Sequence, residues 1–462
     1  MSTPYWVADA VFYQIFPDRF ANGDPNNDPP NVAPWGSEPT IWNFMGGDLR
    51  GIINHLDYLL DLGVNAIYLN PIFHSTSNHR YNTYDYYRID PKLGTMADFR
   101  ALLHAAHSNG MRVILDGVFN HTGRGFFAFN DILENGEHSP YLCWYHIHNL
   151  PVRAYGEDKA EDYEAWWGFK SLPKLNTNCP EVRDFIYGVA RHWLREGIDG
   201  WRLDVPNEID DDEFWQEFRR VVKAENPDAY LVGEIWTADP RWVQHFDGLM
   251  NYPLRDAIIA FLNGNLTASD FDNRLLELAS IYPPENALAM YLPLGSHDTP
   301  RILTELGTPE KVKLAFAIQF AYLGAPAIYY GDEIGIAGGK DPDNRRAFPW
   351  EQDKWNADLR AWVQKLIAIR KRAAALRRGS FHLITQQGKQ TCAVFARKLG
   401  ADGVLVLVNP STVKRHCHLD VRTLGWEDGY IVHDLLGGTE AIVDGHTLHW
   451  DAPPLSAAWL AH

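Results

Sequence analysis

The sequence contains little of what nucleic-acid-binding, membrane-spanning or secreted proteins require. Its 42 Lys and Arg residues are outnumbered by 59 Asp and Glu, which gives the 462-residue chain a formal net charge of -17. Such a charge repels phosphate backbones and anionic lipids, so we expect neither nucleic acid nor a membrane as a partner. No window is long and apolar enough to cross a bilayer, and the first residues lack the basic run and apolar core of a secretion signal. We therefore expect a cytoplasmic protein.

Cysteine is also scarce. Cys143, Cys179, Cys392 and Cys417 are scattered without a CxxC spacing, which argues against a zinc knuckle or a disulfide framework. We interpret all four as free or buried thiols. Aromatic residues, in contrast, are abundant, with 17 Trp in the chain. Flat rings suit the apolar faces of sugars, although most of these rings should lie in the core.

Short apolar runs alternate with helical periodicity over most of the chain. The runs lie at residues 10–15, 66–69 and 113–115, around 201 and 231, and at 249–250, 289–292 and 327–330. Eight strands separated by helices predict a closed (β/α)8 barrel, whose reactive groups gather at the C-terminal ends of the strands. A doubly wound sheet is the alternative, but no Gly-rich phosphate-binding turn follows the first run.

Two segments depart from this alternation. Some sixty residues after the third run are rich in Gly, His and aromatics, too long for a simple loop. After a last helix near residues 358–376 the apolar period changes to two and turns become frequent, which predicts an antiparallel β-sandwich. We divide the chain into a first part of the barrel (1–121), an inserted domain (122–178), a second part of the barrel (179–377) and a C-terminal β-sandwich (378–462).

Two of the apolar runs end in an acidic residue. In the run Gly200-Trp201-Arg202-Leu203-Asp204, side chains two apart point the same way, so Arg202 lies beside Asp204 and favours its ionised form. The next run ends at Glu234. Two carboxylates at the ends of successive strands can act on one substrate, as glycoside hydrolysis requires. The alternative is that each acid only caps its strand or the helix that follows.

Four segments in order resemble the four sequence regions of the α-amylase family, the retaining glycoside hydrolases of family 13. They are residues 116–121 (Asp-Gly-Val-Phe-Asn-His), 200–208, 233–236 and 296–298. The segment 172–176 (Leu-Pro-Lys-Leu-Asn) resembles the fifth region in the form used by neopullulanases, cyclomaltodextrinases and maltogenic amylases. Five motifs in the correct order over nearly the whole chain are a highly specific signal.

The resemblance implies a role for each matching residue. Asp204 would be the nucleophile, Glu234 the acid and then the base, and Asp298 the residue that steadies the distorted sugar. The residues implied to contact or orient the substrate are Tyr81, Asp116, His121, Arg202, Asn207, Glu208, Trp236 and His297.

An Asx-rich segment near the N-terminus offers oxygen ligands of the kind that calcium prefers. By composition alone an ordinary Asx-rich turn is the favoured explanation. The resemblance implies a structural Ca²⁺ site made by Asn22, Asp24, Asn27, Asp28, Gly46 and Asp48.

The sequence departs from its relatives in three places. They usually carry an extra N-terminal β-domain that builds a dimer, whereas here the first predicted strand begins within a dozen residues, so we favour a monomer slightly. Pro206 stands where relatives mostly have Ala, and Thr237 follows Trp236 where His is usual. Proline fixes φ, so Asn207 and Glu208 can be placed differently.

The leading hypothesis is a hydrolase that cleaves α-1,4-glucosidic bonds, with α-1,6 bonds as a second linkage, in maltooligosaccharides, cyclodextrins, pullulan or starch through a covalent β-glycosyl-enzyme intermediate. One alternative is a transglycosylase on the same scaffold, in which a sugar hydroxyl replaces water. Another is a sugar-binding module without catalysis, which we would expect to have lost the acids first.

Overall fold

The core of the protein is a closed parallel barrel. The computed structural model describes residues 3–388 and 390–462. Eight parallel strands form one sheet in the order β8-β7-β6-β5-β2-β1-β10-β9. The strands are β1 (Phe12–Ile15), β2 (Ala66–Leu69), β5 (Arg112–Gly117), β6 (Gly200–Leu203), β7 (Tyr230–Gly233), β8 (Gly248–Leu249), β9 (Tyr291–Pro293) and β10 (Ala325–Tyr329). Met250, directly after β8, forms a parallel bridge with Tyr291 of β9 and closes the ring. The predicted (β/α)8 barrel is confirmed.

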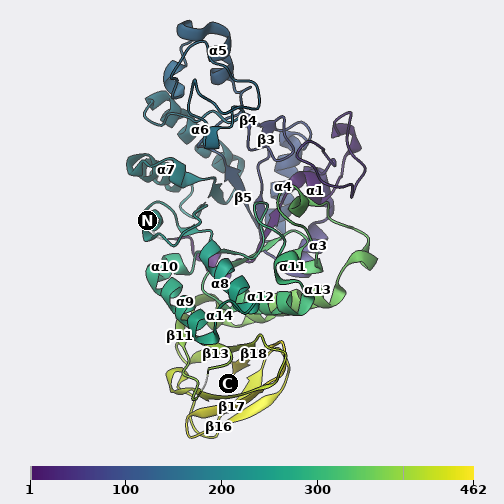
Figure 1. Cartoon of the computed structure of the whole chain (residues 1–462), viewed down its shortest axis with the longest axis vertical. Coiled ribbons are helices and arrows are strands. Elements are labelled where there is room, and N and C mark those ends of the chain that lie inside the picture. The colour runs from purple at the N-terminus through teal and green to yellow at the C-terminus, as the bar shows by residue number, and fades with distance from the viewer. Residues whose placement is uncertain (1–2, 389) are drawn as a thin grey trace.

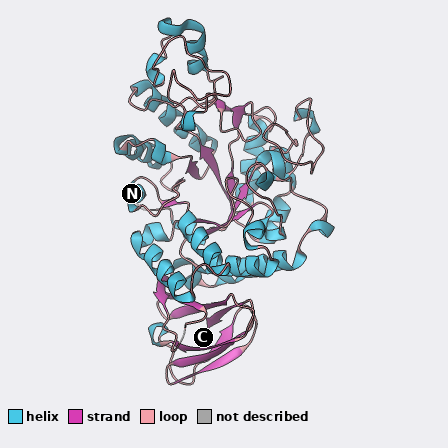
Figure 2. Ribbon diagram, in the orientation of Figure 1, coloured by secondary structure: helices cyan, strands magenta, loops and turns pink. Residues whose placement is uncertain are grey.

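Helices surround the barrel (Figure 2). Strands covered by helices on one side and by the barrel interior on the other are buried on both faces, which explains their unbroken apolar runs. The helices of the barrel are α1 (Pro17–Phe20), α2 (Leu49–Asn54), α3 (Leu56–Leu62), α4 (Met96–Ser108), α6 (Pro180–Glu196), α7 (Asp212–Glu225), α8 (Tyr252–Leu262), α9 (Ala268–Ile281), α10 (Pro284–Ala287), α11 (Ile302–Leu306), α12 (Pro309–Ala321), α13 (Ala357–Arg372) and α14 (Ala374–Arg378). Among the described residues, no helix has the length and hydropathy needed to cross a membrane.

The chain leaves the barrel between β5 and α6 and forms a projection at one end of the molecule (Figure 1). This excursion contains α5 (Phe127–Asn135), and the hairpin of β3 (Phe73–Ser75) and β4 (Thr83–Ile89) adjoins the barrel nearby. Bridges from His121 to Lys174 and from Tyr145 to Leu175 join the outgoing and returning strands of the excursion. The segment therefore returns to the point at which it left.

That return makes one sequence-based expectation wrong. Cys143 and Cys179 form a disulfide, with Cα atoms 5.7 Å apart despite a separation of 36 residues. Cys143 lies in the excursion, and Cys179 is the N-cap residue of α6. The spacing rule failed because the fold, rather than a short motif, brings the two sulfurs together. Cys392 and Cys417 are free and buried, as expected.

The C-terminal region forms an antiparallel eight-stranded sheet, at the opposite end of the molecule from the excursion (Figure 1). Its strands are β11 (Ser380–Leu383), β12 (Ala393–Leu399), β13 (Asp402–Asn409), β14 (Arg415–Asp420), β15 (Ile431–Asp434), β16 (Glu440–Asp444), β17 (Thr447–Ala452) and β18 (Ser456–Ala461). Val394, Leu405 and Leu407 share a core with Leu419 and Leu448, so the sheet folds over on itself.

The opposite face of β12 and β13 packs against the barrel. Phe395 and Val406 belong to the same hydrophobic core as the barrel helices. The fully buried guanidinium of Arg397 donates hydrogen bonds to the carbonyls of Ala321 and Tyr322 at the end of α12, and to those of Leu376 and Gly379 around α14. The sheet and the barrel therefore share one interior.

Candidate active site

One buried arginine organises the polar residues at the C-terminal ends of the barrel strands. Arg202, in β6, is 1% exposed. Its Nη1 atom lies 2.9 Å from Asp116 Oδ1 and 2.7 Å from Asp204 Oδ1, and its Nη2 atom lies 2.8 Å from Glu234 Oε2. A single guanidinium thus joins Asp116, near the end of β5, to the acids directly after β6 and β7. From the sequence we predicted that Arg202 contacts Asp204 only. In the structure its guanidinium contacts three carboxylates.

Two hydrogen-bond donors orient Glu234 beside this ion pair. The backbone N–H of Val205 donates to Oε2 at 2.9 Å, and the indole Nε1 of Trp236 donates to Oε1 at 3.1 Å. Val205 has φ 36° and ψ 51°, a left-handed conformation that is rare and costly for a β-branched residue. This strained turn aims the Val205 N–H at the carboxylate, and Pro206 follows it as the first residue of a short 3-10 helix.

Asp116 anchors a second set of side chains beside the first. Its Oδ2 atom accepts hydrogen bonds from the hydroxyls of Tyr68 and Tyr81, at 2.6 and 2.7 Å. The Tyr81 hydroxyl also lies 2.7 Å from His297 Nε2, and the two rings are parallel, with centroids 5.2 Å apart. Tyr81 therefore bridges the acids near Arg202 and the segment that carries Asp298.

Asp298 lies at the open side of the cluster. His297 Nε2 is 3.1 Å from Asp298 Oδ2, and the guanidinium of Arg345 is 3.8 Å from Oδ1. The Asp298 side chain is 31% exposed, whereas those of Asp204 and Glu234 are 9% and 5% exposed. The three acids expected to be catalytic thus border one site, with Asp298 nearest to solvent.

Burial dominates the electrostatics of this cluster. Burial raises the pKa of Asp204 well above its ordinary value; the charge of Arg202 opposes the rise and that of Glu234 adds to it. The pKa of Asp298 is raised to about 7, first by loss of solvation at its partly buried position and then by the charge of Glu234. Burial lowers the pKa of His121 to about 4 and that of His297 well below its usual range, the latter with help from Arg345. Both histidines are therefore neutral at physiological pH.

The other residues implied to contact substrate lie around this cluster at different distances. His121 is buried and stacks on Trp166, with centroids 5.7 Å apart, and its Nε2 atom has no hydrogen-bond partner within the described ranges. Trp236 stacks on Tyr252, with centroids 3.8 Å apart, and is 46% exposed. Asn207 and Glu208 lie on the 3-10 helix after Val205, and neither side chain bonds to the acids among residues 3–388 and 390–462.

Three polar residues near the site were not identified from the sequence. Gln14 of β1 and Asn70, just after β2, hydrogen-bond to each other at 3.0 Å. Gln14 Nε2 also lies 3.0 Å from His297 Nδ1, Asn70 donates to the Tyr81 hydroxyl, and Arg345 Nε donates to the carbonyl of His297. Gln14 and Asn70 could have been found from the sequence, because each is a polar residue in or just after an otherwise apolar strand. For Arg345 no such signal existed.

The six residues of the expected calcium site also come together. Asn22 Nδ2 lies 2.9 and 3.0 Å from the Asp28 oxygens. Gly46 has φ +81°, and a Cβ atom there would lie 2.3 Å from Asp28 Oδ1 and 2.5 Å from Asn22 Nδ2. Burial raises the pKa of Asp28, and the charges of Asp48 and Asp24 add to the rise. The six residues are thus tightly packed, and their clustered carboxylates have no cation to balance their charge among the residues that the structure describes.

Two further observations test whether these residues fit a cation. The Oδ1 atom of Asn27 is buried and has no hydrogen-bond partner within the described residues, which leaves an acceptor for a metal. The Asp48 carboxylate, in contrast, accepts from the backbone N–H groups of Gly23, Asp24 and Gly51 and caps α2. The set fits an oxygen-binding cation, with Asp48 holding the loop in shape.

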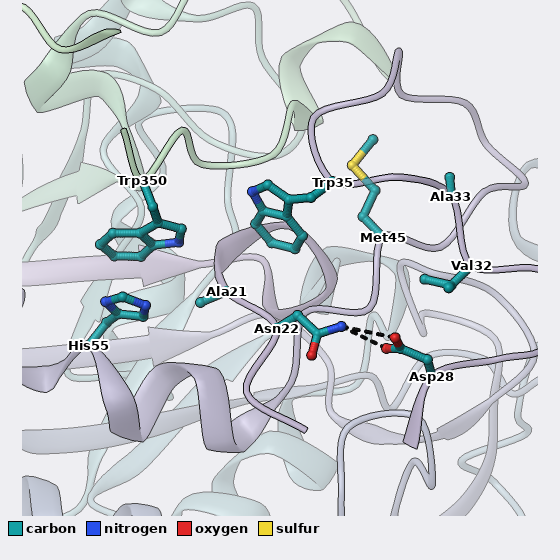
Figure 3. Close-up of a pocket in the computed structure, with 9 residues that line it drawn as sticks. All are labelled: Ala21, Asn22, Asp28, Val32, Ala33, Trp35, Met45, His55 and Trp350. Carbon is teal, nitrogen blue, oxygen red and sulfur yellow. Dashed lines mark hydrogen bonds between the residues drawn. The ribbon is translucent and has the colours of Figure 1, made fainter. Parts of the chain in front are cut away.

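A cavity of about 310 Å³ borders this loop (Figure 3). The parallel rings of His55 and Trp350, 3.6 Å apart, lie at one end, and Asn22 and Asp28 lie at the other. None of the three expected catalytic acids lines this cavity. The Asx loop and its cavity are therefore separate from the acidic cluster.

Comparisons with known proteins agree with this geometry. The family model described as the catalytic domain of alpha amylase matches residues 14–379. A cyclomaltodextrinase of Geobacillus thermopakistaniensis is 44% identical over 98% of this chain and 76% of its own, and neopullulanase 2 of Thermoactinomyces vulgaris is 45% identical over 92% and 73%. The solved structure of a cyclic alpha-maltosyl-(1-->6)-maltose hydrolase from Arthrobacter globiformis, 40% identical, covers 100% of both chains with a TM-score of 0.90.

Proposed function

Because the chain belongs to the α-amylase family, we propose that it is a retaining glycoside hydrolase that cleaves α-1,4-glucosidic bonds in α-glucans. The observation that carries the proposal is the Arg202 guanidinium, which holds Asp204 and Glu234 on adjacent nitrogens. Retention requires two carboxyl groups only about 5 to 5.5 Å apart, whereas inverting enzymes separate them by roughly 6.5 to 9.5 Å to admit a water. Sharing one guanidinium favours the shorter arrangement.

In the proposed reaction Asp204 attacks the anomeric carbon, and the bond to the leaving oxygen breaks as Glu234 donates its proton to that oxygen. The product is a β-glycosyl ester of Asp204. Glu234, now ionised, takes a proton from water, whose oxygen attacks the same carbon and releases Asp204. Two inversions at one carbon give net retention.

Neighbouring groups suit a sugar at this position. The neutral imidazole of His121 can donate a hydrogen bond from its unpaired Nε2 atom to a sugar hydroxyl, and Asp298 can accept from others. His121, Trp166 and Trp167 form a run of stacked rings that ends at Trp167, which is 70% exposed. Sugar rings present apolar faces to such aromatic surfaces.

The proposed substrates are maltooligosaccharides, cyclodextrins, pullulan and starch, with α-1,6 bonds as a second linkage. The relatives' names support this range, since they include a cyclomaltodextrinase, a neopullulanase and a hydrolase of a cyclic sugar with 1→6 linkages. Transglycosylation is the second candidate, because the exposed Trp236 beside Glu234 offers a platform for an acceptor sugar.

Incubation with maltotriose tests the proposal. We expect shorter sugars released as the α-anomer, followed by NMR before mutarotation. Asp204→Asn should abolish turnover while the protein stays folded and binds sugar, and the exposed control Asp353→Asn should remain active. Release of the β-anomer would refute retention, turnover by Asp204→Asn would remove it as nucleophile, and longer products dominating at low conversion would favour transglycosylation.

We further propose a structural Ca²⁺ held by oxygens of Asn22, Asp24, Asn27, Asp28 and Gly46, in the loop that Asp48 braces. When bound, the ion would neutralise the clustered carboxylates; it takes no part in the reaction. A cation that binds only the folded chain at about one hundred times its Kd stabilises it by roughly 2.7 kcal/mol. Chelation should therefore lower Tm, and Asp28→Ala should lose both the bound calcium and this response. An unchanged Tm with no calcium by elemental analysis would refute the site.

A further inference from the structure

A groove of about 680 Å³ runs along the outside of the barrel between α8 and α9. Its lining extends from Trp236 and Thr237 at the site to Ala260 and Leu266 near the connection of the two helices. The distance along α8 from Pro253 to Ala260 is about 10 Å at 1.5 Å per residue. Stacked rings of Phe261 and Phe271, 4.4 Å apart, hold the helices together. The volume lies within the range of small-molecule sites, roughly 300 to 1,000 Å³.

The groove is continuous with the active site through a single side chain. Trp236 lines the groove and also donates its Nε1 hydrogen to Glu234. One face of its ring is covered by Tyr252, yet the residue remains 46% exposed. Because Glu234 would protonate the leaving oxygen, Trp236 and the groove lie on the leaving-group side of the scissile bond.

The lining has the chemistry of a carbohydrate site. Pro253, Ala257 and Ala260 contribute a mostly apolar strip along α8, while Asn273 and Arg274 contribute polar groups from α9. An apolar floor with polar edges matches a sugar chain, whose ring faces are apolar and whose edges carry hydroxyls. The side chain of Asn273 makes no hydrogen bond within residues 3–388 and 390–462, so its donors and acceptor are available.

The acidic residues of the groove do not favour a cation instead. Asp256 pairs with Arg255 at 3.1 Å, Glu277 pairs with Arg274 at 2.6 Å, and Asp270 belongs to the capping box of α9. Each carboxylate therefore already has a partner. A neutral polyhydroxylated chain fits better than an ion.

We propose that this groove binds the arm of a long or branched α-glucan that continues from the leaving side of the cleaved bond. The proposal rests on the proposed function and extends it to a preference for substrates longer than the active site alone can hold. Thr237 lines the groove beside Trp236, and its short side chain occupies little of the mouth.

Binding and kinetics with short and long probes test the groove. In the Asp204→Asn background, Kd is measured for maltotriose and for maltoheptaose by calorimetry; in the active enzyme, kcat/KM is measured for maltotriose and for long maltodextrin. Asn273→Trp fills the groove, and Thr237→Trp blocks its mouth. Ser269→Trp, exposed on α9 outside the groove, is the matched control.

We expect each blocking variant to reduce the preference for the long over the short sugar about fivefold, both in the ratio of Kd values and in the ratio of kcat/KM values. A fivefold change is about the free energy of one hydrogen bond. The control should keep the original ratio. Ratios that are the same in all variants, with hydrolysis intact, would overturn the groove and leave the proposed function standing. A chain that cleaves no α-glucan would overturn the proposed function, and the binding ratio would still decide the groove.

Discussion

Glu333 is a buried acid outside the active site, and the effect of its raised pKa on stability can be measured. It lies in a 3-10 helix after β10 and is fully buried. Its Oε1 atom accepts from the hydroxyls of Tyr13 and Tyr58, while Oε2 has no hydrogen-bond partner among the described residues. Burial raises the pKa of Glu333 from 4.5 to about 7. We predict that Glu333→Gln, which stays neutral, makes the protein progressively more stable, relative to the unaltered chain, as pH rises.

The sign and size follow from the pKa of Glu333. A raised pKa gives stability that is complete below the ordinary value of 4.5 and is lost as pH rises through about 7. Between about pH 5 and about pH 8 this loss is about 2.5 kcal/mol. With roughly 2.1 cal/mol/K of unfolding entropy per residue, the 462 residues convert this to about 3 °C in Tm. The amide that replaces the carboxyl in Glu333→Gln brings buried hydrogens whose cost is equal at every pH, so only the change with pH is diagnostic.

Differential scanning calorimetry of both proteins across this pH range measures the effect. The difference in Tm, variant minus unaltered chain, should rise by about 3 °C from about pH 5 to about pH 8. The exposed control Glu137→Gln should keep a constant difference. Parallel Tm curves for Glu333→Gln and the unaltered chain would show that this carboxyl is ionised without cost, and would refute the reasoning.

Three further outcomes are expected. Arg202→Met should lower kcat by about a thousandfold or more and destabilise the fold by roughly 3 to 5 kcal/mol, because the carboxylates around it lose the cation that they share; near-normal kinetics would contradict this. The acid limb of kcat/KM should titrate above the ordinary Asp value of 3.8, since Asp204 must be ionised to attack and burial raises its pKa; a limb at that value would argue against it. Alkylation of the denatured, unreduced chain should label two cysteines and leave Cys143 and Cys179 unlabelled; four labels would exclude the disulfide.

Strand positions could be predicted because their physical cause is local. The run at residues 66–69 coincides with β2, since a strand buried on both faces must be apolar throughout. Other ends shifted by a few residues: the first strand begins at Phe12 rather than at residue 10, after a 3-10 helix over Tyr5–Asp9. In the C-terminal sheet the period of two, which predicts the sandwich, is visible in β14, where the buried Cys417 and Leu419 alternate with the exposed His416 and His418.

The positions of the acids at strand ends could also be predicted from the local sequence pattern. The ion pairs and hydrogen bonds that join these acids to one another could not. The sequence shows that Arg202 and Asp204 share a face, yet only the closed barrel shows that Glu234 lies on the other nitrogen of the same guanidinium. The left-handed turn at Val205 is likewise a tertiary effect, since a β-branched residue gives no local signal for it. Cys143 and Cys179 show most plainly what the sequence alone cannot predict. They meet only because the excursion after β5 folds back to the start of α6.

The buried side chain of Arg397 has a consequence for how the molecule comes apart. Its guanidinium, on a strand of the C-terminal sheet, supplies hydrogens to carbonyls that terminate two helices of the other domain. Detaching the C-terminal sheet would leave those carbonyls without a hydrogen-bond donor. It would also expose the apolar face of β12 and β13 to water. Heating should therefore melt both domains in a single cooperative transition, and a truncated chain should aggregate rather than persist as an independent catalytic unit.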